Sequence, residues 1–176
     1  MTEYLFFWGH RPLPDGRIGK PCLSQWWPAE FTVDGERYPT AEHFMMVGKA
    51  RLFGDEEIAT KIFAAPTPDA AKSLGRKVRG FDDELWTKHR YDIVVRGTEA
   101  KFSQNPPLHG YLVGTGNAVL VEASPVDPIW GIGLAADSPD ARHPDRWRGL
   151  NLLGKALMEV RDRLRQGTPR TMPKSP

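Results

Sequence analysis

The sequence has a single cysteine, Cys22, among its 176 residues, so the chain cannot form a disulfide within itself. Its five histidines form no HxxxH or HxxH pair, a spacing typical of metal ligands on one helix. Because thiolates and imidazoles are the usual ligands of structural zinc, the sequence predicts no metal site. The segments GTG and GIG are too short for phosphate-binding motifs, and no other pattern indicates a cofactor.

Long apolar runs are absent too. No stretch of about 18 apolar residues occurs, and the N-terminus lacks the basic start and apolar stretch of a signal peptide. The 24 Lys and Arg residues nearly balance the 22 Asp and Glu residues, which leaves a formal net charge of +2. That excess is too small to predict a nucleic-acid or membrane surface, although it allows a local basic pocket. We therefore expect a cytoplasmic protein without a membrane partner; the sequence leaves its oligomeric state open.

What is present favours one domain with a substantial core, since the chain is long enough and 40% of its residues are hydrophobic. Short strands are predicted at residues 3–8 and 118–124, and a hairpin over residues 30–38 turns at Asp34-Gly35. Helices are predicted after the N-cap Thr40, over residues 55–64, within 66–78 after the N-cap Thr67, within 81–106 and over 150–164.

These elements neither alternate strand with helix nor form an all-β pattern. They favour the α+β class: a mostly helical single domain, residues 1–165, with a small, mainly antiparallel sheet. The polar residues that follow, 166–176, are expected to form a disordered tail.

The segment PTAEHFMMVGK, residues 39–49, predicts a helix that is apolar on most sides yet carries Glu42 and Lys49 along one line. Seven residues bring a helix almost back to the same direction, so these side chains share a stripe about 10 Å apart. A helix apolar on most sides is normally buried, and buried ionisable groups are costly unless they are paired or face a polar cavity. Either Glu42 complements the helix N-terminus and Lys49 extends to water, or both line a functional site.

A second group of polar and aromatic residues lies in the segment VEASPVDPIWGIG, after the predicted strand at residues 118–124. A loop at the end of a rigid strand often carries functional groups, here Asp127 and Trp130. Gly131 would let the backbone approach a ligand closely. The alternative is that Asp127-Pro128 is a simple turn and that Trp130 fills the core.

Five segments occur in the order of a known family: DGERYPTAEHFMMVGKA, LGRKVRGF, the helix of Trp86 that ends in EAKFSQNP, LVGTGNAVLVEASPVDPIWGIG and WRGLNLLGKALMEVR. From about residue 23 to residue 165 the chain resembles the YbiA-like proteins, also called the NADAR family. The resemblance implies an α+β fold and hydrolysis of N-glycosidic bonds. One branch is similar to enzymes that cleave ribosylamino-pyrimidine phosphate intermediates of riboflavin synthesis. Another is similar to enzymes that remove ADP-ribose from modified guanine in nucleic acid.

By this resemblance, Glu42 takes the place of the family's functional glutamate and Lys49 that of the lysine seven residues later. Asp127 and Trp130 occupy the positions of its D..WG motif, and Asn151 that of the asparagine in G.N.LG.

The chain departs from the family where the usual SNF reads SQW, at residues 24–26. Ser24 is kept as a candidate for substrate binding. The larger Gln25 and the following Trp26 are expected to reshape the pocket, and so to affect the choice of substrate more than the chemistry.

Breaking the C1′–N bond of a riboside leaves positive charge on the sugar, which a carboxylate stabilises; a carboxylate can also activate the attacking water. We therefore expect Glu42 to act as base and electrostatic stabiliser. Asp127 would bind the ribose hydroxyls or share the acid–base work. Lys49 would either neutralise a phosphate or attack the ring-opened sugar to form a Schiff base.

The remaining candidates have alternatives of their own. Trp130 is expected to stack on a flat heterocycle, whereas Trp86, on a long helix, either stacks or fills the core. Lys101 either complements the C-terminus of that helix or contacts a phosphate. Asn151 either caps the last helix or binds ribose.

The leading prediction is a metal-independent N-glycosidase that hydrolyses the C1′–N bond of a ribosylamino-pyrimidine phosphate and releases ribose 5-phosphate. The rival enzyme is an ADP-ribosyl glycohydrolase, for which nucleic acid would be a partner only as the modified substrate. A third alternative is a module that binds ADP-ribose or NAD without cleaving it. Glu42 disfavours this module, because an anion binder gains nothing from a buried carboxylate beside its ligand.

Overall fold

Helix α1 (Ala41–Leu52) lies in the middle of the computed structural model, which describes residues 1–167. Three helices pack against it: α2 (Glu56–Phe63), α3 (Pro68–Gly75) and α4 (Asp83–Gln104). Eight of the 12 residues of α1 are buried. The predicted burial of this helix is therefore confirmed, and its polar side chains must find partners or a cavity inside the protein.

Side-chain caps fix where these four helices begin. Thr40, Asp55, Thr67 and Asp82 each accept a hydrogen bond from the backbone N–H three residues further along the chain. Each bond satisfies one amide group that the first helical turn leaves without a partner. The caps predicted at Thr40 and Thr67 are confirmed.

The hairpin predicted from Asp34-Gly35 is present. Strands β2 (Phe31–Val33) and β3 (Glu36–Tyr38) pair in antiparallel fashion. The two turn residues have φ angles of 51° and 78°, the left-handed region that Asp tolerates and Gly adopts freely.

The second strand pair is parallel, which differs from the expected mainly antiparallel sheet. β1 (Tyr4–Phe7) pairs with β4 (Val119–Glu122), with Phe7 opposite Glu122. Helices α1 to α5 lie between these strands in the sequence, so the connection is long enough for a crossover. A local turn signal such as Asp34-Gly35 can predict only the antiparallel pair.

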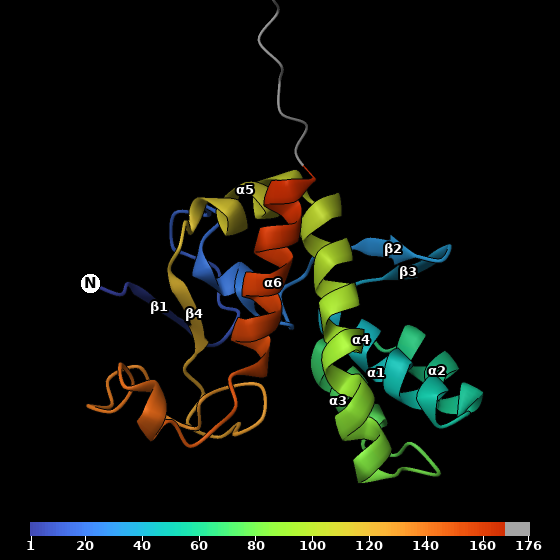
Figure 1. Cartoon of the computed structure of the whole chain (residues 1–176). Helices are drawn as coiled ribbons and strands as arrows, with labels where there is room; N and C mark the ends of the chain where they lie inside the picture. The colour runs from blue at the N-terminus through green and yellow to red at the C-terminus, as the bar shows by residue number, and fades with distance from the viewer. Residues whose placement is uncertain (168–176) are drawn as a thin grey trace, which may run out of the picture.

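Helix α6 (Leu152–Gln166) lies between α4 and β4, as Figure 1 shows. Helix α5 (Pro106–Gly114) was not predicted, because the prolines after Asn105 were expected only to end the preceding helix. They do end α4, but they also occupy the first positions of α5, where a missing N–H costs nothing. Two short 3₁₀ turns, Lys20–Leu23 and Pro144–Arg146, complete the described elements.

The α+β class is confirmed: most of the regular structure in residues 1–167 is helical, and two small strand pairs accompany it. Helix α6 continues one residue past the expected domain end at 165. The tail expected to be disordered lies, from residue 168 onward, outside the described residues. Among residues 1–167, no helix combines the length and the apolar character needed to cross a membrane.

Lys101 is a buried lysine in the core, with only 1% of its surface exposed, and burial lowers its pKa to about 7. From α4 its Nζ donates to the backbone carbonyls of Cys22 and Ser24, at 2.7 and 2.8 Å. These bonds hold the 3₁₀ turn and the segment after it against α4. The lysine therefore fixes the position of residues 24–26, which the sequence marked as a departure from the family.

We expect Lys101→Met to lower the free energy of unfolding by about 1–3 kcal/mol, because two buried carbonyl groups lose their donor. Urea unfolding followed by circular dichroism measures the change. Lys88→Met, which alters an exposed lysine of the same helix, is the matched control. Equal stability of the two variants would contradict the anchoring function of Lys101.

Candidate functional site

A cavity of about 430 Å³ lies where α1, α3, α4 and the end of β4 meet. The segments after β1 and after the first 3₁₀ turn complete its wall. Six of the predicted site residues line it and so come together from four parts of the sequence: Ser24, Glu42, Lys49, Trp86, Asp127 and Trp130.

Glu42 enters the cavity from the first turn of α1, and only 4% of its surface is exposed. Burial raises the pKa of its carboxyl group to about 7; the positive charge of Lys72 opposes this rise, and the negative charge of Asp127 adds to it. The carboxyl group can therefore exchange a proton near neutral pH. His43, the next residue, does not line the cavity: its imidazole bonds to Thr40 Oγ1 and to the carbonyl of Ala65.

Asp127 forms the expected turn, and its side chain also lines the cavity. Its Oδ1 accepts from the backbone N–H groups of Ile129 and Trp130, each at 2.9 Å. Ser124 Oγ accepts from the N–H of Asp127 at 3.1 Å. These bonds orient the carboxylate before any ligand binds. Trp130 likewise lines the cavity while packing against the hydrophobic core.

Three cations line the cavity: Lys49 from α1, Lys72 from α3 and Arg76 just after α3. Among residues 1–167 none of them has a carboxylate within ion-pair distance. Lys49 Nζ lies 4.8 Å from the ring centre of Phe81 and 5.8 Å from that of Trp86. Burial, and then the charge of Arg76, lowers the pKa of Lys49.

Glu122, at the end of β4, is a site residue that the sequence reasoning missed. Burial, with added repulsion from Asp127 and Glu42, raises the pKa of its carboxyl group to about 8. The only indication of this position in the sequence is that Glu122 is an ionisable residue directly after a run of apolar strand residues. Lys72 and Arg76 were missed as well, because charges on a short helix are usually solvated.

Three predicted site residues do not line the cavity. Asn151 uses its side chain inside the protein: Oδ1 accepts from the N–H of Glu122, and Nδ2 donates to the carbonyl of Leu120, both at 3.0 Å. Gly131 does permit a close approach, but to the protein's own backbone: a Cβ there would lie 2.8 Å from the Glu122 carbonyl oxygen. Lys101 is the third, and its two carbonyl acceptors replace the phosphate contact considered for it. These three residues contact the backbone near the residues that line the cavity, and so support the site without lining it.

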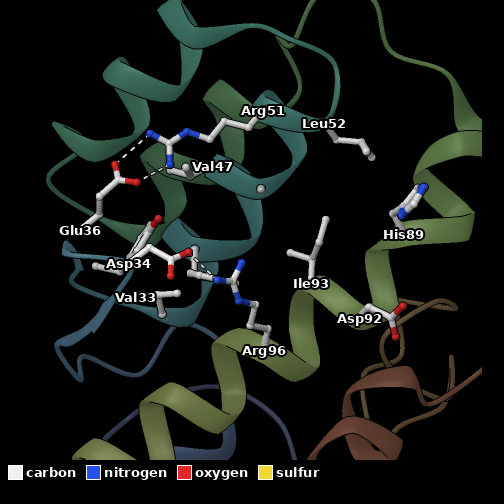
Figure 2. Close-up of a pocket in the computed structure, with 13 residues that line it drawn as sticks. Val33, Asp34, Glu36, Val47, Arg51, Leu52, His89, Asp92, Ile93 and Arg96 are labelled. Atoms are coloured by element: carbon white, nitrogen blue, oxygen red, sulfur yellow. Dashed lines mark hydrogen bonds and ion pairs between the residues drawn. The ribbon is translucent and has the colours of Figure 1, made fainter.

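A second cavity, of about 410 Å³, lies on the other side of α1, between the β2–β3 hairpin and α4 (Figure 2). Its arginines already have acidic partners: Arg51 binds Glu36 through two hydrogen bonds, and Arg96 binds Asp34. The first cavity differs because, within residues 1–167, its two lysines and its arginine have no ion-pair partner, and because the carboxyl group of Glu42 is buried. That contrast identifies the first cavity as the candidate functional site.

The charges of this site are divided between two walls. Glu42, Glu122 and Asp127 form an acidic group where α1 meets the end of β4, and Lys49, Lys72 and Arg76 form a basic group along α1 and α3. A ligand with a cationic or hydroxyl-rich part next to an anionic part matches this arrangement.

Comparison with known proteins gives the class of protein. The chain is 44% identical over 169 residues to an N-glycosidase of Acanthamoeba polyphaga mimivirus, an alignment that covers 93% of this chain and 98% of the relative. It is 31% identical over 169 residues to a riboflavin biosynthesis protein of Vibrio vulnificus, and this alignment covers 96% of this chain and 41% of the relative. The similarity places the chain among hydrolases that act on N-glycosyl bonds.

The family and the fold agree with this class. The NMR structure of the Escherichia coli protein YbiA superposes with a TM-score of 0.71 at 27% sequence identity, covering 94% of this chain and 88% of that one. The NADAR domain matches residues 6–165. The chain therefore belongs to the NADAR family, and the resemblance drawn from its motifs is confirmed.

Glu42→Gln should stabilise the protein at alkaline pH. The carboxyl group loses its proton near pH 4.5 when unfolded but near 7 when folded, so the unfolded chain binds fewer protons between these values and wild-type stability falls as pH rises. Glutamine has no such dependence. We compare the free energy of unfolding of the variant with that of the wild type at two pH values. The difference should favour the variant by on the order of 1–3 kcal/mol more at pH 8 than at pH 4.

Thermal unfolding at several pH values measures this difference. Glu30→Gln, which changes an exposed carboxylate, should track the wild type at every pH. A Glu42→Gln effect that is independent of pH would show that the carboxyl group is not desolvated.

Proposed function

We propose that the protein hydrolyses the C1′–N bond of a ribosylamino-pyrimidine phosphate and releases ribose 5-phosphate. The observation that carries this proposal is the buried carboxyl group of Glu42, which shares one cavity with Asp127 and with three cations that have no ion-pair partner within residues 1–167. Such a cavity offers separate surroundings for a sugar that becomes positive and for a phosphate that stays negative.

The acidic wall serves the sugar. As the C1′–N bond breaks, positive charge develops on the ribose ring, and the ionised Glu42 stabilises it and accepts a proton from the attacking water. Because Asp127 Oδ1 is fixed by two backbone N–H groups, its carboxylate is oriented to bind the ribose hydroxyls. Both groups act from positions that are set before the substrate arrives.

The basic wall serves the phosphate. Lys72 and Arg76 are four residues apart, so they lie on the same side of α3, and Lys49 faces the same cavity from α1. Lysine binds phosphate as a point charge, and arginine can form two parallel hydrogen bonds with it. A substrate with a phosphate at its 5′ carbon would place C1′ toward the acidic wall.

Aromatic side chains complete the site for a flat heterocycle. Trp130 and Trp26 both line the cavity, and Lys72 Nζ lies 5.8 Å from the ring centre of Trp26. Stacking of a base on such a ring contributes about 1–3 kcal/mol. The Vibrio vulnificus relative is named for riboflavin biosynthesis, which supports a pyrimidine precursor of riboflavin as the heterocycle.

One observation favours the rival reaction, removal of ADP-ribose from guanine. Trp8 lines the cavity while 59% of its surface is exposed, and His10 beside it lies 5.7 Å from Trp26 between ring centres. Exposed aromatic groups at the edge of a pocket would suit a second base outside it. The two reactions release different sugars, so they can be told apart directly.

A product assay should offer the purified protein both substrates, a ribosylamino-pyrimidine phosphate and ADP-ribosylated guanosine. We expect release of ribose 5-phosphate from the first, and a loss of roughly 100-fold or more in kcat for Glu42→Gln, because general base catalysis contributes at least that much. Glu30→Gln is the surface control. Release of ADP-ribose alone would establish the rival, and calorimetric binding without any product would establish a binding module.

The phosphate assignment has its own test. We expect Lys72→Gln combined with Arg76→Gln to raise KM for the phosphorylated substrate roughly 10-fold or more, because each lost charged hydrogen bond is worth about 1.5–3 kcal/mol. The same pair of changes should alter the hydrolysis of the dephosphorylated substrate far less. Lys77→Gln, at an exposed neighbouring lysine outside the cavity wall, is the control. An equal effect on both substrates would contradict the phosphate assignment.

A further inference from the structure

Glu122 has no role in the reaction of Glu42 and Asp127, although it lines the same cavity and has a buried oxygen without a hydrogen-bond partner within residues 1–167. Its backbone is fixed on both sides: its N–H donates to Asn151 Oδ1 at 3.0 Å, and its carbonyl accepts from the N–H of Ile132 at 2.9 Å. β1 lies alongside, with Phe7 opposite. The side chain thus extends from a rigid support into the wall of the cavity.

One oxygen of this side chain, Oε2, is buried and has no hydrogen-bond partner within residues 1–167. A buried carboxylate without a partner is strongly disfavoured, whereas the neutral acid avoids the cost of a buried charge and keeps a proton to donate. Buried polar atoms in proteins nearly always have a partner. Because no group within residues 1–167 satisfies Oε2, the site favours the neutral acid, whose proton stays available to a ligand in the cavity that Glu122 lines.

We propose that Glu122 is the general acid that protonates the departing nitrogen. The inference rests on the proposed function, hydrolysis of a bond between ribose C1′ and an amine nitrogen. In that step the oxygen of water bonds to C1′ while the C1′–N bond breaks and its electron pair moves to nitrogen. The nitrogen takes the proton of Glu122, and Glu42 takes a proton from the water. One proton must then pass from Glu42 to Glu122 before the next turnover.

The surroundings of the two glutamates assign these opposite functions. Three groups lower the pKa of Glu42 against the effect of burial: the charge of Lys72, a hydrogen bond from the Trp26 side chain and the charge of Lys49. Glu42 therefore ionises first. Glu122 is raised by burial, by Asp127 and by Glu42, with only Lys72 against it, and so it keeps its proton longer. The ionisable groups that share the cavity with these two are His10, Lys49, Lys72, Arg76 and Asp127.

The pH dependence follows from this order. The base must be ionised, so kcat/KM rises through about pH 7; the acid must be protonated, so kcat/KM falls above about pH 8. Glu122→Gln keeps the size of the side chain but removes its proton. We expect it to lower kcat by roughly 100-fold or more and to abolish the fall at alkaline pH. Glu122→Asp, which keeps an acid, should retain that fall at a reduced rate.

A second measurement does not depend on turnover. Infrared difference spectra between wild type and Glu122→Gln should show a protonated carboxylic acid at pH 7 that ionises at higher pH; Glu122→Asp replaces Glu122→Gln if that variant fails to fold. The difference spectrum between wild type and Glu30→Gln should lack this carboxylic acid signal at pH 7. An ionised Glu122 at pH 7, or a Glu122→Gln enzyme that keeps both its rate and its alkaline fall, would overturn the assignment. Failure of the product assay alone would instead remove the proposed function, because the infrared result stands without a substrate.

Discussion

The burial of one carboxyl group at the start of an apolar helix is the constraint on which this structure depends. Glu42 cannot face solvent, because α1 is surrounded by α2, α3 and α4. Glu42 also has no close ion pair among residues 1–167. Burying its charge costs free energy, and this cost is reduced because the carboxyl group faces a polar cavity and has a raised pKa. The cations of α3 and the carboxyl groups near β4 make that cavity polar. The helix that organises the core therefore also places the group that the proposed reaction uses as its base, and the burial of this group lowers the stability of the fold.

The second half of the site is held by interactions that have no contact with a ligand. The side chain of Asn151 connects the start of α6 to β4 through hydrogen bonds to Leu120 and Glu122, and it does so with a left-handed φ of 53°. Lys101 performs a similar task for the segment that carries Ser24. Two of the polar residues expected to bind substrate thus position the residues that line the cavity. Such supporting bonds hold the residues that line a cavity in one geometry before a ligand binds, so that less conformational entropy is lost on binding.

The sequence predicted those features whose signals are local. Helical periodicity placed Glu42 and Lys49 on one face of α1, turn chemistry predicted the hairpin at Asp34, and the loop after β4 indicated Asp127. Features that depend on long-range packing could not be predicted from the sequence. Three features arise only when distant segments meet: the parallel pairing of β1 with β4, the lack of an ion-pair partner for Lys72 within residues 1–167, and the burial of Glu122 Oε2. Lys101 is a further example, since its position near a helix end suggested a contact with the helix C-terminus or with a phosphate, and only the fold shows its two carbonyl partners.

The pairing of β1 with β4 makes the first residues of the chain a support of the candidate site, although none of them is an acid or base in the proposed reaction. The N–H of Ala123 donates to the carbonyl of Phe7, so the strand that ends in Glu122 has its outer edge covered by the N-terminal strand. Trp8 and His10 continue from that strand directly to the mouth of the cavity. Trimming or fusing the chain at this end would therefore disturb the reacting groups from more than a hundred positions away in the sequence.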